Sequence, residues 1–191
     1  MKILSKEKIK ELPRAVLFDT DNTLYPYDPA HLKAINAVRE KVKDKFSISE
    51  NEFDKLFQKA RENVKQRLRG TASSHSRLLY FQRLLEMLGL GTQVLTSLDL
   101  EQTYWRSFLK NAELFSGVKD LLDDLRILGI PTAVVTDLTT QIQFRKIVYF
   151  GLDNDFDYIV SSEEAGFDKP HESPFQMAVE KLGVKDKIWM V

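Results

Sequence analysis

The chain carries carboxylate, hydroxyl and ammonium side chains at three places that a parallel sheet would bring together. Asp19 and Asp21 follow the apolar run 14–18, which has the pattern of a strand buried on both faces. Thr136 ends a second apolar run, and Lys169 lies in the loop after a third. Two carboxylates, a hydroxyl and a lysine are the groups that phosphoryl transfer requires. The sequence therefore predicts a phosphoryl-transfer site at the carboxyl edge of a sheet.

Each of these side chains has a role that follows from its chemistry. Asp19 would attack phosphorus in line and form an acyl-phosphate, which divides one difficult displacement into two easier ones. Asp21 would act as acid and base, because crowding two carboxylates near a phosphate dianion raises the pKa of one of them. Thr136 and Asp137 would bind the phosphate, and Lys169 would neutralise both the nucleophile and the substrate. A Mg²⁺ ion would offset the remaining repulsion between the anions.

Four short apolar runs have the character of strands, and helical patterns precede the last three. The runs are residues 14–18, 130–136, 156–161 and 188–191. Apolar residues recur at helical spacing before Gly129, Gly151 and Gly183, and a glycine is a common end for a helix. Strands and helices that alternate in this order predict an α/β fold with a Rossmann-like, doubly wound parallel sheet.

The first crossover between strands is too long for a single helix. A crossover with its helix needs about a dozen residues, whereas the stretch from Asp19 to Thr136 is many times longer. Residues 29–110 have apolar residues at helical spacing in about four segments joined by polar turns. We therefore expect a core domain of residues 1–28 and 111–191, with an α-helical cap domain of residues 29–110 inserted between them.

Composition and charge exclude several classes of protein. Lys plus Arg number 28 and Asp plus Glu number 28, so the net charge is zero and favours neither nucleic acid nor an anionic membrane. The absence of cysteine excludes disulfides, thiol catalysis and cysteine-bound metals. Residues 1–13 are rich in charge and lack the apolar segment of a secretion signal, and no stretch is apolar enough for a membrane span. We expect a cytoplasmic protein.

The segments around the chemical side chains resemble three motifs of the haloacid dehalogenase-like (HAD) hydrolase superfamily. Residues 18–25, FDTDNTLY, are similar to the first motif, residues 134–137, VVTD, to the second, and residues 161–170, SSEEAGFDKP, to the third. The resemblance covers the whole chain, since residues 29–110 are similar to the C1-type helical cap of subfamily I. Relatives with this cap are monomers or dimers, so the resemblance leaves a monomer and a homodimer open.

The resemblance implies a role for each residue of the site. It implies that Asp19 is the nucleophile and that Asp21 is the acid and base whose backbone carbonyl also binds Mg²⁺. Thr136 would supply the phosphate-binding hydroxyl and Lys169 the charge-balancing ammonium. Dehalogenases that resemble the family's namesake lack a carboxylate at the position of Asp21, so the resemblance implies a phosphatase with a small phosphorylated substrate. Residues 21–26, DNTLYP, are further similar to the pyrimidine 5′-nucleotidase-like branch, which implies a nucleoside monophosphate.

The resemblance is incomplete at the end of the sequence. The fourth motif of the family follows a fourth strand with Gly-Asp and supplies a further carboxylate to the metal, whereas the sequence stops at Val191. We therefore expect this further metal ligand beyond Val191, in a longer chain. Three alternatives stay open: a phosphomutase, a dehalogenase on the same scaffold, and a non-catalytic pseudo-phosphatase.

Several residues outside the motifs have a structural as well as a functional interpretation. Residues 73–77, SSHSR, could face the site and select the leaving group, or a serine among them could cap the next helix with His75 exposed. The charge run 61–69 is typical of a solvated helix face. His31 and His171 have no second ligand at metal spacing, so we expect both at the surface.

Overall fold

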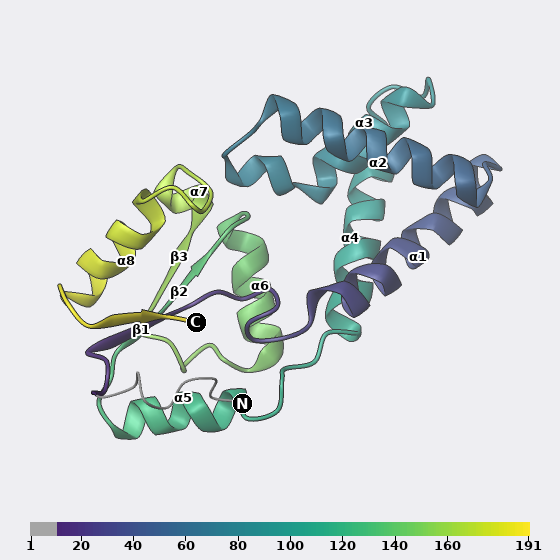
Figure 1. Ribbon diagram of the computed structural model, residues 1–191. Coiled ribbons are helices and arrows are strands. Elements are labelled where there is room, and N and C mark those ends of the chain that lie inside the picture. Colours follow the sequence, from purple (N-terminus) through teal and green to yellow (C-terminus); the bar gives the residue numbers. More distant parts are fainter. Residues whose placement is uncertain (1–10) are drawn as a thin grey trace.

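The computed structural model describes residues 11–191 and shows a parallel sheet flanked by helices, with a further group of helices beside it (Figure 1). The sheet has the order β3-β2-β1-β4, and all neighbouring strands are parallel. Its strands are β1 (Ala15–Phe18), β2 (Thr132–Thr136), β3 (Tyr158–Ser161) and β4 (Ile188–Met190). The chain moves outward from β1 to β3 and then returns to the other side of β1. The predicted doubly wound sheet is confirmed, and its direction switches at β1.

Helices cover both faces of the sheet, which explains why β1 and β2 are apolar without alternation. The helices are α5 (Val118–Ile127), α6 (Thr140–Phe150), the short α7 (Ser162–Ala165) and α8 (Ser173–Leu182). Val16 and Val134 share a buried core with residues of α5 and α6. Leu17 and Val135 share a separate core with residues of α7 and α8. Residues 1–10 of the expected core segment lie outside the described residues.

The stretch between β1 and α5 is helical, as the sequence predicts. It contains α1 (Tyr27–Phe46), α2 (Glu50–Arg67), the 3-10 helix η2 (Ala72–His75), α3 (Arg77–Met87) and α4 (Val94–Lys110), which together are termed the helical insert. The helical insert extends away from the sheet in Figure 1. The hydroxyl of Ser76 accepts a hydrogen bond from the N–H of Leu79, so Ser76 caps α3, which was one of its two interpretations.

Aromatic rings fill the interior of the helical insert. Phe57 stacks on Phe53 and on Phe81, with ring centroids 5.9 Å apart in both pairs. Phe108 continues this core toward the sheet, because its ring meets that of Tyr25, just after β1, edge to face at 6.1 Å. One continuous core therefore joins the helical insert to one face of the sheet.

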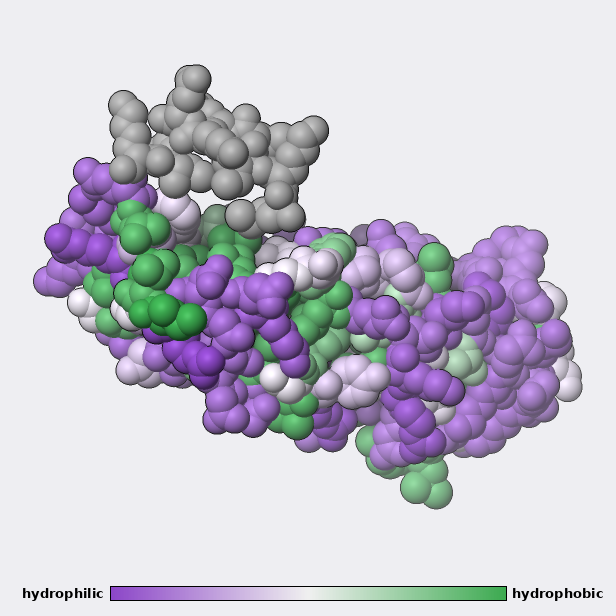
Figure 2. Space-filling view, turned by 90° about the horizontal axis from the view of Figure 1, so that it is seen from below, coloured by the Kyte–Doolittle hydropathy of each residue, from purple (hydrophilic) through white to green (hydrophobic). Residues whose placement is uncertain are grey.

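The surface over the sheet and the surface of the helical insert differ in hydropathy. Figure 2 shows hydrophobic residues gathered on the half of this face that contains the sheet, whereas the far end of the helical insert is largely hydrophilic. No helix within residues 11–191 has both the length and the apolarity needed to cross a membrane.

Replacement of Phe81 by alanine should destabilise the protein strongly. The side chain is fully buried between Phe57 and Tyr104, so Phe81→Ala leaves a cavity that neighbouring rings cannot fill. We expect a loss of about 3–5 kcal/mol in the free energy of unfolding, measured by urea denaturation. Phe144→Ala removes a ring that is 49% exposed and should cost under about 1 kcal/mol. Equal losses in the two variants would contradict this account of the core.

Candidate active site

The turn after β1 holds Asp19 and Asp21 at the carboxyl end of the central strand. Asn22 has a positive φ of 62°, a conformation that asparagine adopts more readily than most residues. Its side-chain oxygen accepts a hydrogen bond of 2.9 Å from the N–H of Tyr27, the first residue of α1. The chain therefore turns within a few residues from β1 into the helical insert, and both carboxylates stay at the switch point of the sheet.

Asp19 forms an ion pair with Lys169, as the motif spacing predicts. The Nζ atom of Lys169 lies 2.7 Å from Oδ1 of Asp19 and also donates to the carbonyl of Val135 at 3.0 Å. The N–H of Thr20 donates to the same oxygen of Asp19 at 2.7 Å. Both contacts fall on Oδ1, and 32% of the side chain is exposed. A carboxylate held by a cation but still accessible can act as a nucleophile.

Asp21 has a cation of its own, which lies outside the three motifs. The Nζ atom of Lys146, on α6, donates to Oδ1 of Asp21 at 2.8 Å, and the hydroxyl of Tyr25 donates to the same oxygen. The Lys146 ammonium is buried and faces the rings of Tyr25, Trp105 and Phe108 at 5.5 to 5.7 Å. Such ring faces attract a cation that has lost its water.

The charges around Asp21 lower the pKa of its carboxyl. Burial alone would raise the pKa of Asp21, but the charge and hydrogen bond of Lys146, with the hydroxyl of Tyr25, hold this pKa below its usual range. The sequence argument predicted a raised pKa from crowding with a phosphate dianion, which concerns the complex with substrate and stays a prediction. In the protein alone, Lys146 supplies a positive charge that the motifs do not contain.

The residues after β2 complete this end of the site. Thr136 is buried, and its hydroxyl shares a hydrogen bond of 2.8 Å with the hydroxyl of Thr20. Asp137 accepts a hydrogen bond of 2.8 Å from the N–H of Lys169, while burial raises the pKa of its carboxyl. Leu138 has a φ of 94°, a strained value for a residue with a side chain, and strain of this kind concentrates at functional sites.

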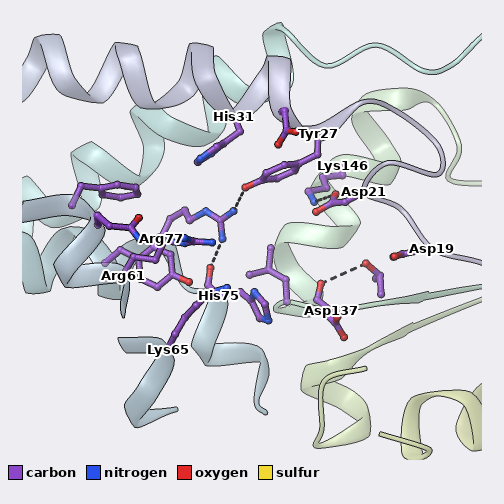
Figure 3. Close-up of a pocket in the computed structure, with 16 residues that line it drawn as sticks. Asp19, Asp21, Tyr27, His31, Arg61, Lys65, His75, Arg77, Asp137 and Lys146 are labelled. Atoms are coloured by element: carbon purple, nitrogen blue, oxygen red, sulfur yellow. Dashed lines mark hydrogen bonds and ion pairs between the residues drawn. The ribbon is translucent and has the colours of Figure 1, made fainter. Parts of the chain in front are cut away.

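A cavity of about 390 Å³ lies between these residues and the helical insert. Its core wall contains Asp19, Asp21, Thr136, Asp137, Leu138 and Lys146. Its other wall comes from the helical insert and contains Tyr27, Asp28, His31, Phe57, Gln58, Arg61, Lys65, His75, Arg77 and Tyr80. Figure 3 shows Asp19, Asp21 and Asp137 on one side and the arginines, Lys65 and both histidines on the other. The volume lies within the range of about 300–1,000 Å³ typical of small-molecule sites.

Two residues of the charge run 61–69 do not lie on a solvated face. Arg61 and Lys65 are only partly exposed and line the cavity. They lie one helical turn apart on α2, so they project from the same face. The expectation of a solvated face is wrong for these two residues, because α2 packs with that face above the site. The periodicity of α2 could not reveal this, since it does not say what covers a polar face.

Residues 73–77 meet the core as well as the cavity. His75 lines the cavity, and its Nε2 atom lies 3.2 Å from Oδ2 of Asp168, next to Lys169 in the third motif. The N–H of Asp168 donates to the carbonyl of Gly70 at 2.9 Å. Arg77 donates to the hydroxyl of Tyr27 at 2.5 Å and to the carbonyl of His75 at 2.6 Å. Thus His75 is not merely exposed, and this segment joins the helical insert to the third motif.

His31 is not a surface residue, contrary to the expectation from sequence. Its Nδ1 atom lies 2.7 Å from the hydroxyl of Tyr104, and its ring stacks on Tyr27 at a centroid distance of 5.2 Å. Burial, together with the charges of Arg77 and Arg61, lowers the pKa of His31 to about 4, against the attraction of Asp28. His171, by contrast, is exposed, as predicted.

A signal for Lys146 was present in the sequence. Gln143 and Lys146 lie three residues apart among Ile142, Ile147 and Phe150, so two polar side chains share the apolar face of one helix. Both are buried, and Gln143 donates to the carbonyl of Asp137 at 2.5 Å. Buried polar residues of this kind need partners and are rare without a function. The helix pattern could have identified Lys146 as a candidate, although not its partner.

The site offers some of the oxygen donors that a Mg²⁺ ion needs. Within residues 11–191, no three His, Cys, Asp or Glu side chains lie close enough together to hold a metal ion. Mg²⁺ in enzyme sites is often bound by one or two carboxylates together with waters and substrate phosphates. The partly exposed carboxylate of Asp19 and the backbone carbonyl of Asp21 are oxygen donors of the required kind.

The sequence matches one protein family over nearly its whole length. Residues 16–191 match the family described as haloacid dehalogenase-like hydrolase. A ribulose-1,5-bisphosphate 5-phosphatase from Halopiger xanaduensis is 36% identical over 169 residues, which cover 88% of this chain and 71% of the relative. A glyceraldehyde 3-phosphate phosphatase from Methanopyrus kandleri is 30% identical over 173 residues, which cover 90% of this chain and 71% of the relative.

Solved structures share the fold at lower sequence identity. The magnesium-bound HAD-hydrolase YfnB from Bacillus subtilis has a TM-score of 0.67 and 22% identity, and the match covers 94% of this chain and 79% of that one. A HAD phosphatase from Thermococcus onnurineus also has a TM-score of 0.67 and 22% identity, with 92% of this chain and 75% of that one covered. These similarities extend to the arrangement of the sheet and the helices.

The stability of the protein should fall between pH 6.5 and 4, in part because of His31. The unfolded chain binds a proton at this histidine below about pH 6.5, whereas the folded protein does so only near pH 4. Protons therefore favour unfolding in this window, and the stability contributed above pH 6.5 is lost as the pH falls. We expect His31→Gln to show a shallower decline of melting temperature from pH 6.5 to 4 than the wild type.

The exposed histidine provides the control for this measurement. His171→Gln should leave the decline as steep as in the wild type. Parallel curves for the wild type and His31→Gln would contradict the lowered pKa of the half-buried imidazole.

Proposed function

The chain belongs to the haloacid dehalogenase-like hydrolase family, and we propose that it is a Mg²⁺-dependent phosphatase that acts on a small phosphorylated metabolite through an aspartyl-phosphate. The relatives named as phosphatases support the reaction class. We further propose that the helical insert is the cap of the family, with a core of residues 1–28 and 111–191 and a cap of residues 29–110. The cytoplasmic location and the monomeric or homodimeric state stay predictions.

One observation carries this proposal. Asp19 and Asp21 lie side by side at the end of β1, each pairs with a different lysine, and both line one cavity. A structural pair of aspartates in a turn would not need two separate cations from distant parts of the chain. Two carboxylates in different charge environments can take different roles, one as nucleophile and one as acid and base.

In the proposed reaction, Oδ2 of Asp19 attacks the phosphorus, because Oδ1 is engaged by Lys169 and by the N–H of Thr20. The new Oδ2–P bond forms as the bond between phosphorus and the leaving oxygen breaks. In the complex, the negative charge of the phosphate raises the pKa of Asp21, so that Asp21 takes up a proton from solvent. Asp21 gives this proton to the leaving oxygen and later takes one from the water that attacks the aspartyl-phosphate. Inorganic phosphate then leaves, and the carboxylate of Asp19 is restored.

The other residues of the site hold charge and exclude water. Lys169 neutralises the nucleophile and the transferred group, and Thr136 and Asp137 contact the phosphate from the end of β2. Lys146 holds Asp21 in place. Mg²⁺, bound by the Asp19 carboxylate and the Asp21 carbonyl, would neutralise negative charge on the phosphate. The helical insert covers the site, which separates the aspartyl-phosphate from bulk water.

The class of metabolite can be narrowed by the relatives. Their names give a sugar bisphosphate and a sugar monophosphate as the substrates of those enzymes. These names favour a phosphorylated sugar for this chain, whereas residues 21–26 led to the prediction of a nucleoside monophosphate. A panel of sugar phosphates and nucleoside monophosphates, assayed for phosphate release with Mg²⁺, decides between the two.

Asp19→Asn should abolish phosphate release, because an amide cannot form the covalent intermediate. We expect kcat to fall by a factor of about 10³ or more. The assay measures free phosphate from a chromogenic phosphate ester in the presence of Mg²⁺. Asp123→Asn, at an exposed position of α5, should behave as the wild type. Unchanged activity in Asp19→Asn would refute the proposed function, and so would product analysis that found only halide release or an isomerised phosphate ester.

Lys146→Met should lower kcat while leaving the protein folded. Methionine fits between the aromatic rings, and the half-buried carboxylate of Asp21 keeps access to water, but Asp21 loses the contact that fixes its position. We expect kcat to fall by about 10- to 100-fold with a smaller change in KM. Arg145→Met changes the exposed neighbour on the same helix and should change neither constant appreciably. A loss confined to KM would contradict the positioning of Asp21 by Lys146.

A further inference from the structure

Three cations of the helical insert point at the site from the side opposite the aspartates. Arg61 and Lys65 come from α2, and Arg77 is the first residue of α3. All three line the cavity that contains Asp19, and Figure 3 shows them across the cavity from it. The cavity is therefore polarised, with the nucleophile at one end and positive charge at the other.

Within the described residues, none of these three cations forms an ion pair with a carboxylate. Among residues 11–191, no Asp or Glu oxygen lies within 4.0 Å of a side-chain nitrogen of Arg61, Lys65 or Arg77. The lysines beside the two aspartates, Lys146 and Lys169, each have a carboxylate within 2.8 Å. The carboxylates of the nucleophile end are thus paired directly, whereas Lys65 and Arg77 have only the more distant charges of Asp168 and Asp21.

The three cations also oppose one another. Burial lowers the pKa of Lys65, and the charges of Arg61 and Arg77 lower it further, against the attraction of Asp168. Burial likewise lowers the pKa of His75, against the attraction of Asp168, and Lys65 and Arg77 add to this lowering. Like charges that crowd in a partly buried site destabilise the folded protein unless an anion binds between them.

Arg77 is held rigidly in this cluster. Its guanidinium faces the rings of Tyr104 and Trp105 at 5.2 and 5.4 Å. Its nitrogens donate to the hydroxyl of Tyr27 and the carbonyl of His75. A fixed guanidinium keeps its charge directed at the cavity at little cost in entropy, while Arg61 and Lys65 remain able to adjust to a ligand.

We propose that the substrate carries a second anionic group, a phosphate or a carboxylate, which Arg61 and Lys65 bind while the scissile phosphate lies at Asp19. This inference rests on the proposed phosphatase function, because it concerns the other end of the same substrate. Arg77 adds positive potential from behind these two residues. A neutral sugar or nucleobase at this end would leave the cations unpaired, so the site disfavours metabolites with a single charged group.

The test compares substrates that share one carbon skeleton. A sugar bisphosphate, a phosphorylated sugar acid and a sugar monophosphate are assayed with the wild type, Lys65→Met and Arg61→Gln. We expect the wild type to prefer the bisphosphate, the acid or both over the monophosphate. In each variant the loss of kcat/KM for the preferred substrate with two anionic groups should exceed the loss for the monophosphate by about 10- to 100-fold. The bisphosphate and the acid identify which anion the cations accept.

Matched controls come from the exposed face of the same helix. Lys59→Met and Arg67→Gln remove the same charges from exposed positions outside the cavity and should leave the ratio between substrates unchanged. Equal kcat/KM for all three substrates in the wild type would overturn the proposal. An equal loss for every substrate in Lys65→Met and Arg61→Gln would do so as well.

A binding measurement separates this inference from the proposed function. Calorimetric titration of Asp19→Asn with the bisphosphate and the monophosphate needs no turnover. Tighter binding of the bisphosphate, lost when Lys65→Met is added, would support the second anion site even if the wild type hydrolysed none of the substrates. Equal binding of the two compounds would overturn the site, whatever the activity.

Discussion

The arrangement of this site depends on two aspartates that lie two residues apart and need separate cations. Side by side at the end of β1, Asp19 and Asp21 would repel each other and any phosphate if they stood alone. Lys169 supplies one cation from the loop after α7, and Lys146 supplies the other from α6. The two ion pairs connect β1 to both later crossovers of the sheet. The two ion pairs that offset the repulsion between the carboxylates in the folded protein also fix the positions of these carboxylates in the site.

The helical insert adds a second electrostatic feature to this centre. Its aromatic core surrounds Lys146 on one side and holds Arg77 on the other, so the rings of Trp105 and Tyr104 serve packing and charge placement together. The contact of His75 with Asp168 joins the helical insert to the loop that carries Lys169. A change in the position of α2 and η2 would therefore alter the cavity wall and that loop together. Specificity and chemistry are coupled through these few contacts.

The sequence predicted the strands of the sheet correctly, but not which polar residues of the helical insert line the cavity. The apolar runs before Asp19 and Thr136 predicted β1 and β2, because strands buried on both faces leave an unbroken apolar pattern. The insert was equally predictable, since no short crossover could account for the stretch between the two strands. Arg61, Lys65 and His31 were misinterpreted as solvated. A polar residue on an amphipathic helix gives the same pattern whether water or a substrate cavity covers it.

The sequence by itself determined the strands, the order in which their ends follow one another, and the chemical character of Asp19, Asp21, Thr136 and Lys169. These features are local, since they depend on periodicity and on the residue types at strand ends. Only the tertiary structure decided that Lys146 pairs with Asp21. It also decided that the cavity has carboxylates paired with lysines at one end, and at the other end cations that form no ion pair within the described residues. The physical reason is distance along the chain. Lys146 and Asp21, and likewise Lys65 and Asp19, share one cavity only because the helices pack over the carboxyl edge of the sheet.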